Sequence, residues 1–168
     1  FMPVFGLNNG MIPIISYNYG AQKPDRMKRT MKLGVMVGCS IMVFCLAIMQ
    51  VFPGQILKIF DATDEMLLMG IPAVRIMSTA FIFAGFSVTC SGMFQAVGKG
   101  VYSMIVSMAR QLFVILPVAY FLSKAMNSVN GVWAAFPIAE VFSVIISTIF
   151  LLRVYKKIVK PMESVQRD

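Results

Sequence analysis

Five long apolar segments follow one another along the chain, separated by short polar connections. Each is close to or longer than the ~20 residues that a helix needs to cross a hydrocarbon core about 30 Å thick. Because a backbone in lipid must satisfy its hydrogen bonds within the segment, these stretches predict transmembrane helices. The sequence therefore predicts an all-α, polytopic membrane helix bundle. Its single domain covers residues 1–155, with five spans at about 1–21, 33–51, 66–97, 101–123 and 125–152.

Basic residues are concentrated on alternate connections between these segments. If the spans cross the membrane in turn, twelve of the 15 Lys and Arg residues lie on one side: Lys23, Arg26, Lys28, Arg29, Lys32, Lys99, Arg110, Arg153, Lys156, Lys157, Lys160 and Arg167. The other side has Lys58, Arg75 and Lys124, next to the acidic residues Asp61, Asp64 and Glu65. By the positive-inside rule, the sequence predicts an integral plasma (inner) membrane protein with Phe1 outside and a basic cytoplasmic tail over residues 156–168.

The composition agrees with a membrane protein, since 58% of the residues are hydrophobic and only 13% are charged. The net charge of +8 is explained by orientation and by contact with anionic lipid, so we expect the lipid bilayer as a partner and no nucleic acid. The chain opens with Phe1 inside an apolar segment. We therefore expect an upstream portion, the N-terminal half of the same protein, as a further partner.

Chemistry that needs a metal or a redox cofactor is not predicted. Cys39, Cys45 and Cys90 all lie inside apolar segments without close-paired spacing, and the sequence contains no histidine. Such cysteines are expected to pack as small apolar residues. An embedded enzyme would need several polar or titratable groups clustered at one depth, which the spans do not display. We expect no enzyme activity and no cofactor.

Glu140 is the only acidic residue within a predicted span, near the middle of the fifth. An ionised carboxylate at that depth is costly unless it is protonated, paired or hydrated, so it is a candidate functional group. A buried carboxylate can take up and release a proton as access alternates, or hold sodium or a cationic substrate. The alternative is a structural carboxylate that is hydrogen-bonded to a neighbouring helix.

Other polar residues within the spans have two interpretations each. Asn8 and Asn9 could line a substrate path or form interhelical hydrogen bonds, and the second is slightly favoured; Ser87, Thr89 and Ser91 are equally ambiguous. Arg110 and Gln111 lie towards the cytoplasmic face. Arg110 could lock a closed state by pairing with a carboxylate, although snorkelling is favoured from sequence alone. The 15 Met and 14 Phe residues suit either lipid or an adaptable cavity for apolar cations.

Four stretches of the sequence resemble the multidrug and toxic compound extrusion (MATE) family in order and spacing. They are Gly6 to Gly10 with Pro13 to Gln22 and Arg26, Gln95 to Lys99, Ser107 to Pro117, and Gly131 to Glu140. The resemblance covers the chain to about residue 155 and implies helices eight to twelve of a twelve-helix transporter. That family rocks two six-helix halves about a central cavity and exchanges protons or sodium for cationic drugs.

The resemblance implies secondary active efflux of cationic amphipathic small molecules by alternating access, with H⁺ or Na⁺ as the coupling ion. The family's usual cation-site carboxylates lie on its seventh and tenth helices. Neither has a counterpart here, because the resemblance begins at the eighth helix and the third span, which corresponds to the tenth, has no acidic residue. Two alternatives remain. A lipid-linked oligosaccharide flippase of the same superfamily would need a basic cavity, and a structural membrane subunit would need none.

Overall fold

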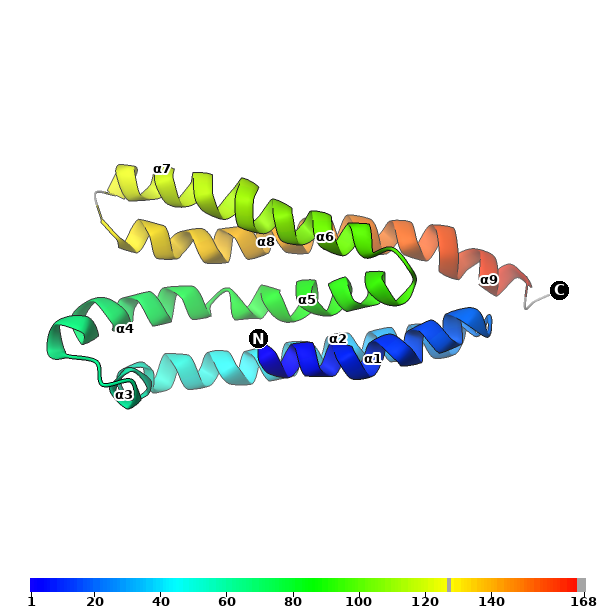
Figure 1. Cartoon of the computed structure of the whole chain (residues 1–168), viewed down its shortest axis with the longest axis horizontal. Helices are drawn as coiled ribbons and strands as arrows, with labels where there is room; N and C mark the ends of the chain where they lie inside the picture. The colour runs from blue at the N-terminus through cyan, green and yellow to red at the C-terminus, as the bar shows by residue number, and fades with distance from the viewer. Residues whose placement is uncertain (127, 166–168) are drawn as a thin grey trace.

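The predicted spans form long antiparallel helices that lie side by side in a bundle (Figure 1). The computed structural model describes residues 1–126 and 128–165, and no strand occurs among them. The helices are α1 (Met2–Gly20), α2 (Pro24–Val51), α3 (Pro53–Ile59), α4 (Asp64–Ser78), α5 (Phe81–Ala96), α6 (Gly100–Met108), η1 (Ala109–Ile115), α7 (Leu116–Met126), α8 (Asn130–Val154), η2 (Tyr155–Val159) and α9 (Lys160–Val165). The all-α prediction is confirmed.

Three helical stretches among the described residues are long and apolar enough to cross a membrane: Pro24–Val51, Gly100–Met126 and Asn130–Ser164. A fourth is obtained if the bent pair α4 and α5 counts as one span. The helix α1, with 19 residues, is not in this set. The predicted count of five spans therefore stays a prediction.

The predicted third span, residues 66–97, is broken rather than continuous. The axes of α4 and α5 differ by 52°, and Thr79 and Ala80 lie between the two helices. A break leaves backbone carbonyls without helical partners, which is costly away from water. Gln50 on α2 compensates, because its Nε2 donates to the carbonyl oxygen of Arg75 at 2.8 Å and to Ser78 Oγ at 3.1 Å.

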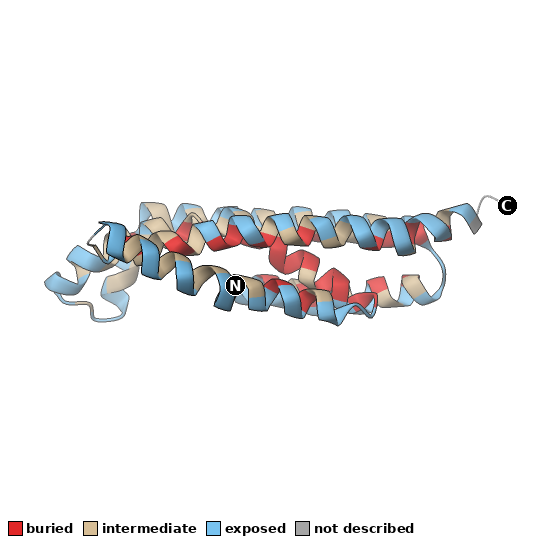
Figure 2. Ribbon diagram, turned by 90° about the horizontal axis from the view of Figure 1, so that it is seen from above, coloured by how far each residue is buried: buried red, intermediate tan, exposed pale blue. Residues whose placement is uncertain are grey.

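The helix α5 lies at the centre of the fold and packs against α1, α2, α6 and α8. Its residues are mostly buried, and the outward faces of the surrounding helices are exposed (Figure 2). Glycine allows a close crossing between α2 and α5. A Cβ atom on Gly85 would lie 2.9 Å from the Cα of Cys39 and 3.0 Å from the carbonyl oxygen of Gly38. Small residues at this crossing therefore set the distance between the two backbones.

One end of the bundle holds the connections α1–α2 and α5–α6 together with α9, and we call it the basic end (Figure 1). An aromatic cluster joins three helices there: Tyr102 on α6 stacks on Phe150 on α8 at 4.4 Å, and Phe94 on α5 contacts both rings edge-on. Met162 on α9 is buried, and Lys28 Nζ lies 2.6 Å from Glu163 Oε1. The C-terminal tail is thereby attached to α2. Arg167 and Asp168, which the sequence analysis places inside the cell, are outside the described residues.

Candidate functional site

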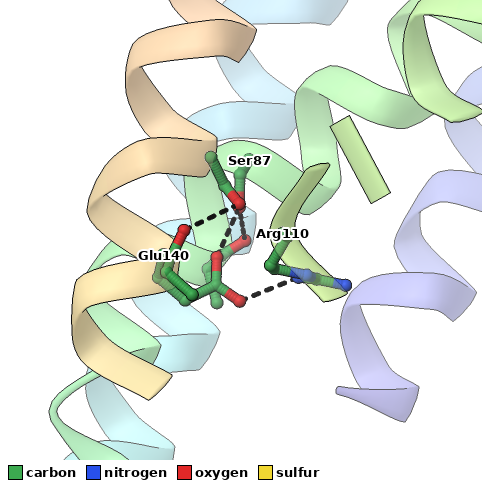
Figure 3. A network of polar contacts seen from close by, with 6 residues as sticks. Ser87, Arg110 and Glu140 are labelled. Atoms are coloured by element: carbon green, nitrogen blue, oxygen red, sulfur yellow. Dashed lines mark hydrogen bonds and ion pairs between the residues drawn. The ribbon is translucent and has the colours of Figure 1, made fainter. Parts of the chain in front are cut away.

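Glu140 is buried in the middle of α8, with 7% of its side chain exposed, and both of its carboxylate oxygens have partners. Arg110 Nη1 donates to Oε1 at 2.8 Å, and Ser87 Oγ donates to Oε2 at 3.0 Å. Figure 3 shows the three side chains converging from α8, η1 and α5. The carboxylate thus accepts one hydrogen bond from a charged donor and one from a neutral donor inside the bundle.

A local change in helical geometry presents Arg110 to Glu140. Residues 109–115 form a π-helical segment between α6 and α7, so the turn that holds Arg110 and Gln111 is wider than an α-helical turn. Such insertions re-aim the side chains that they hold and are frequent at functional sites. Arg110 keeps 24% of its side chain exposed, and its guanidinium pairs with the carboxylate on the neighbouring helix. This geometry favours pairing over snorkelling.

The larger of two cavities beside this network has a volume of about 500 Å³. Glu140, Arg110 and Gln111 supply polar groups to its wall, and Ser78 at the break between α4 and α5 supplies a hydroxyl. The rest of its wall is mostly aromatic and sulfur-containing, from Phe1, Phe5, Phe81, Phe136, Met49 and Met77. An apolar cavity with one acidic group and several aromatic faces suits a planar organic cation.

The smaller cavity has a volume of about 190 Å³, lies towards the basic end and is polar. Eight of its lining residues are polar: Asn8, Asn9, Ser87, Ser91, Gln95, Ser103, Ser107 and Arg110. Asn8 is buried against Gly92, and its Nδ2 donates to the carbonyl oxygen of Val88 at 2.9 Å. The amide oxygen of Asn8, Oδ1, is buried and has no hydrogen-bond partner among the described residues.

The candidate residues from sequence therefore fall into two adjacent groups. Glu140 and Gln111 line the larger cavity, Asn8 and Asn9 line the smaller one, and Arg110 lies between the two. From the sequence, Ser87 is open between a cavity lining and a hydrogen bond between helices, and its contact with Glu140 depends on the fold. A spacing of four residues from Ser87 to Ser91 to Gln95 is the signal that identifies one polar face on α5.

Comparison with known proteins gives the family of this fold and site. The family model described as MatE matches residues 1–121, more than half of the chain. The chain belongs to the MatE family of transporters. The multidrug export protein MepA of Staphylococcus haemolyticus is 27% identical over 131 residues, which cover 78% of this chain and 28% of the relative. Over the matched region, this chain spans less than a third of that relative's length.

Solved MATE structures share the arrangement of the helices. The DinF-BH multidrug transporter in complex with R6G superposes with a TM-score of 0.83 and 32% identity, over 94% of this chain and 35% of that one. An inward-facing multidrug resistance transporter of the same family gives a TM-score of 0.86 at 18% identity, over 97% of this chain and 37% of that one. The second likeness shows the fold alone. The MATE family, to which this chain belongs, consists of integral membrane transporters and not of enzymes.

Proposed function

We propose that this chain forms part of an exporter that removes cationic, aromatic drugs in exchange for protons by alternating access. The larger cavity is the substrate site in this proposal. The observation that carries it is the position of Glu140, the one carboxylate among the described residues that line a cavity of about 500 Å³, whose wall is otherwise rich in aromatic residues. The names of the relatives, multidrug export protein and multidrug transporter, point to the same class of substrate.

Substrate and proton would act on the same carboxylate. In the resting arrangement Arg110 neutralises Glu140. A cation entering the cavity stacks on aromatic rings and competes with Arg110 for the negative charge. Protonation of Glu140 then removes the charge that attracts both cations, so the drug is released. Because proton and drug compete for one carboxylate, only one of them is carried at a time, so protons moving down their gradient can drive the drug in the opposite direction.

The surroundings of Glu140 favour a proton over sodium as the coupling ion. A hard metal cation binds through several oxygen ligands, whereas the hydrogen-bond partners of Glu140 among the described residues are one hydroxyl, from Ser87, and one guanidinium, from Arg110. The guanidinium of Arg110 lies 2.8 Å from the other carboxylate oxygen and would repel a metal ion there. A proton needs no such shell of ligands.

The same cavity argues against an oligosaccharide flippase. The phosphates of a lipid-linked sugar would require unpaired positive charge. Among the described residues of the wall, Arg110 is the only cationic one, and it already pairs with Glu140. We further propose that the transporter resides in the plasma (inner) membrane with its basic end in the cytoplasm, because twelve of the 15 basic residues lie on that side in the predicted topology.

The test is transport of ethidium, a planar aromatic cation, by the full-length protein in proteoliposomes under an imposed pH gradient or sodium gradient. We expect the pH gradient alone to drive ethidium uptake. Glu140→Gln should lower the rate at least about 10-fold and flatten its pH dependence. Glu65→Gln is the matched control, because Glu65 is exposed at the start of α4. Unchanged transport in Glu140→Gln would refute the role of Glu140, and transport driven only by sodium would refute proton coupling.

A further inference from the structure

Beyond the substrate site, the smaller cavity contains two facing rows of polar side chains. On α5, Ser87, Ser91 and Gln95 follow one another at intervals of four residues and so lie along one face of the helix. On α6, Ser103 and Ser107 have the same spacing, and they line the same cavity. The rows begin at Glu140, through Ser87, and end where Gln95 Nε2 donates to Ser103 Oγ at 3.1 Å.

The direction of these rows links Glu140 to one side of the membrane. Ser87 and Gln95 are eight residues apart, which corresponds to about 12 Å along an α-helix. Gln95 lies four residues before Lys99, in the connection at the basic end. The polar face thus covers about 12 Å of the distance from the buried carboxylate to the basic end.

The cavity is large and polar enough to contain water. A space of about 190 Å³ exceeds what a single water molecule needs, and hydroxyl and amide groups on both sides provide the two to four hydrogen bonds that a buried water makes. The unpartnered Oδ1 of Asn8 is a second, independent sign of hydration. Asn8 lines this cavity, and a buried acceptor without a protein partner is the kind of group that an ordered water satisfies.

We propose that the smaller cavity is a hydrated proton route between Glu140 and the basic end of the bundle. The proposal rests on the proton-coupled function of Glu140 given above. Ser87 relays the proton. As Glu140 Oε2 gives up its proton, Ser87 Oγ accepts it and passes its own to the neighbouring water. The proton moves on along waters beside Ser91, and the hydrogen bond of Gln95 to Ser103 closes the far end.

Arg110 separates the proton route from the substrate site. Its side chain lines both cavities, and its guanidinium holds the carboxylate oxygen that Ser87 does not contact. Arg110 and Glu140 are the only charged side chains that line either cavity among the described residues. A substrate cation therefore approaches Glu140 from the aromatic side, while protons leave by the hydroxyl side.

The first experiment measures ethidium exchange by the full-length protein in light and heavy water. Ser91→Leu fills the cavity without touching Glu140, and Ser91→Ala keeps it open. We expect Ser91→Leu and Ser87→Ala to slow pH-driven exchange about 10-fold and to increase the ratio of the rates in light and heavy water, because proton transfer becomes limiting. Ethidium affinity should change less than about threefold, since the aromatic site is intact.

Ser143→Ala is the matched control for Ser87→Ala. Ser143 is equally buried on α8, and its hydroxyl donates to the carbonyl oxygen of Ala139 in its own helix, outside both cavities. Exchange rates and isotope ratios of Ser91→Leu and Ser87→Ala that match those of Ser91→Ala and Ser143→Ala would overturn the route. The function of Glu140 would stand in that case if Glu140→Gln still abolishes pH-driven exchange. The two proposals therefore fail separately.

The second experiment is a structure of the full-length protein at a resolution that shows water. Ordered waters within about 3 Å of the Ser87 and Ser91 hydroxyls would support the route. A side chain from another segment of the protein filling the cavity, with no water beside these hydroxyls, would overturn it. This result does not depend on transport activity, so it tests hydration even if variants lose stability.

Discussion

Arg110 on η1 and Glu140 on α8 form an ion pair 2.8 Å long inside the bundle, with a hydroxyl from α5 on the other carboxylate oxygen. Removing only the arginine would leave a buried charge without its partner. We expect Arg110→Leu to lower the free energy of unfolding by about 3 to 5 kcal/mol in detergent. The double variant Arg110→Leu with Glu140→Leu should recover most of that loss, because no charge is then left unpaired.

Thermal unfolding of the four proteins in this double-mutant cycle measures the coupling directly. Lys58→Leu serves as a control, since Lys58 is exposed on α3. If the stability losses of Arg110→Leu and Glu140→Leu add up to the loss of the double variant, the two residues have no coupling energy. Stability and transport need separate measurement here, because the double variant should fold and yet fail to couple.

The aromatic residues that line the larger cavity are expected to raise the affinity for a cationic drug through cation–π contacts. Phe136 on α8 lines that cavity, whereas Phe142 on the same helix is 48% exposed on the outside. We expect Phe136→Ala to weaken ethidium binding between about 2-fold and 30-fold, the range of one cation–π contact. Phe142→Ala should leave the affinity unchanged. Fluorescence titration of the purified full-length protein compares them, and equal affinities in both variants would remove the cavity as the binding site.

How far the sequence determines this site is clearest at Glu140. Its isolation in an apolar segment marks it as a functional candidate, because a carboxylate at that depth needs a partner. The partner itself is 30 residues away, and a seven-residue π-helical segment determines which way Arg110 points. Neither hydropathy nor helical periodicity reports such a change in helical register. The pairing of Arg110 with Glu140 therefore depends on how the helices pack and does not follow from the sequence pattern.

The break in the third predicted span shows a second limit. Residues 66–97 are predominantly apolar, and Pro72 lies six residues before Ser78, where α4 ends. What stabilises the break is distant in the sequence: Gln50 on α2 satisfies the carbonyl of Arg75. Length and hydropathy could predict the helices of the bundle, but the interruption depends on a hydrogen bond between two helices that only the fold brings together.

At the crossing of α2 and α5, Gly85 is expected not to tolerate an added methyl group. Gly85→Ala would place a carbon 2.9 Å from the Cα of Cys39, so one backbone must move. We expect a loss of about 1 to 3 kcal/mol in the free energy of unfolding. Gly10→Ala on α1 is the control, because nothing lies within 4 Å of the added carbon there. Thermal unfolding in detergent compares the two, and an equally stable Gly85→Ala protein would show that the crossing is not tight.

The orientation of the bundle can be tested by labelling introduced cysteines with a membrane-impermeant maleimide. Thr30 lies at the basic end in α2, and Asp64 begins α4 at the opposite end; both are near the surface. In a protein whose three native cysteines are replaced by serine or alanine, we expect Asp64→Cys to be labelled in intact cells. Thr30→Cys should be labelled only after the membrane is permeabilised, because basic connections stay in the cytoplasm. The reverse pattern would place the basic end outside. The proton route from Glu140 through Ser87 would then lead to the extracellular side, so this measurement also decides whether the smaller cavity takes up protons or releases them.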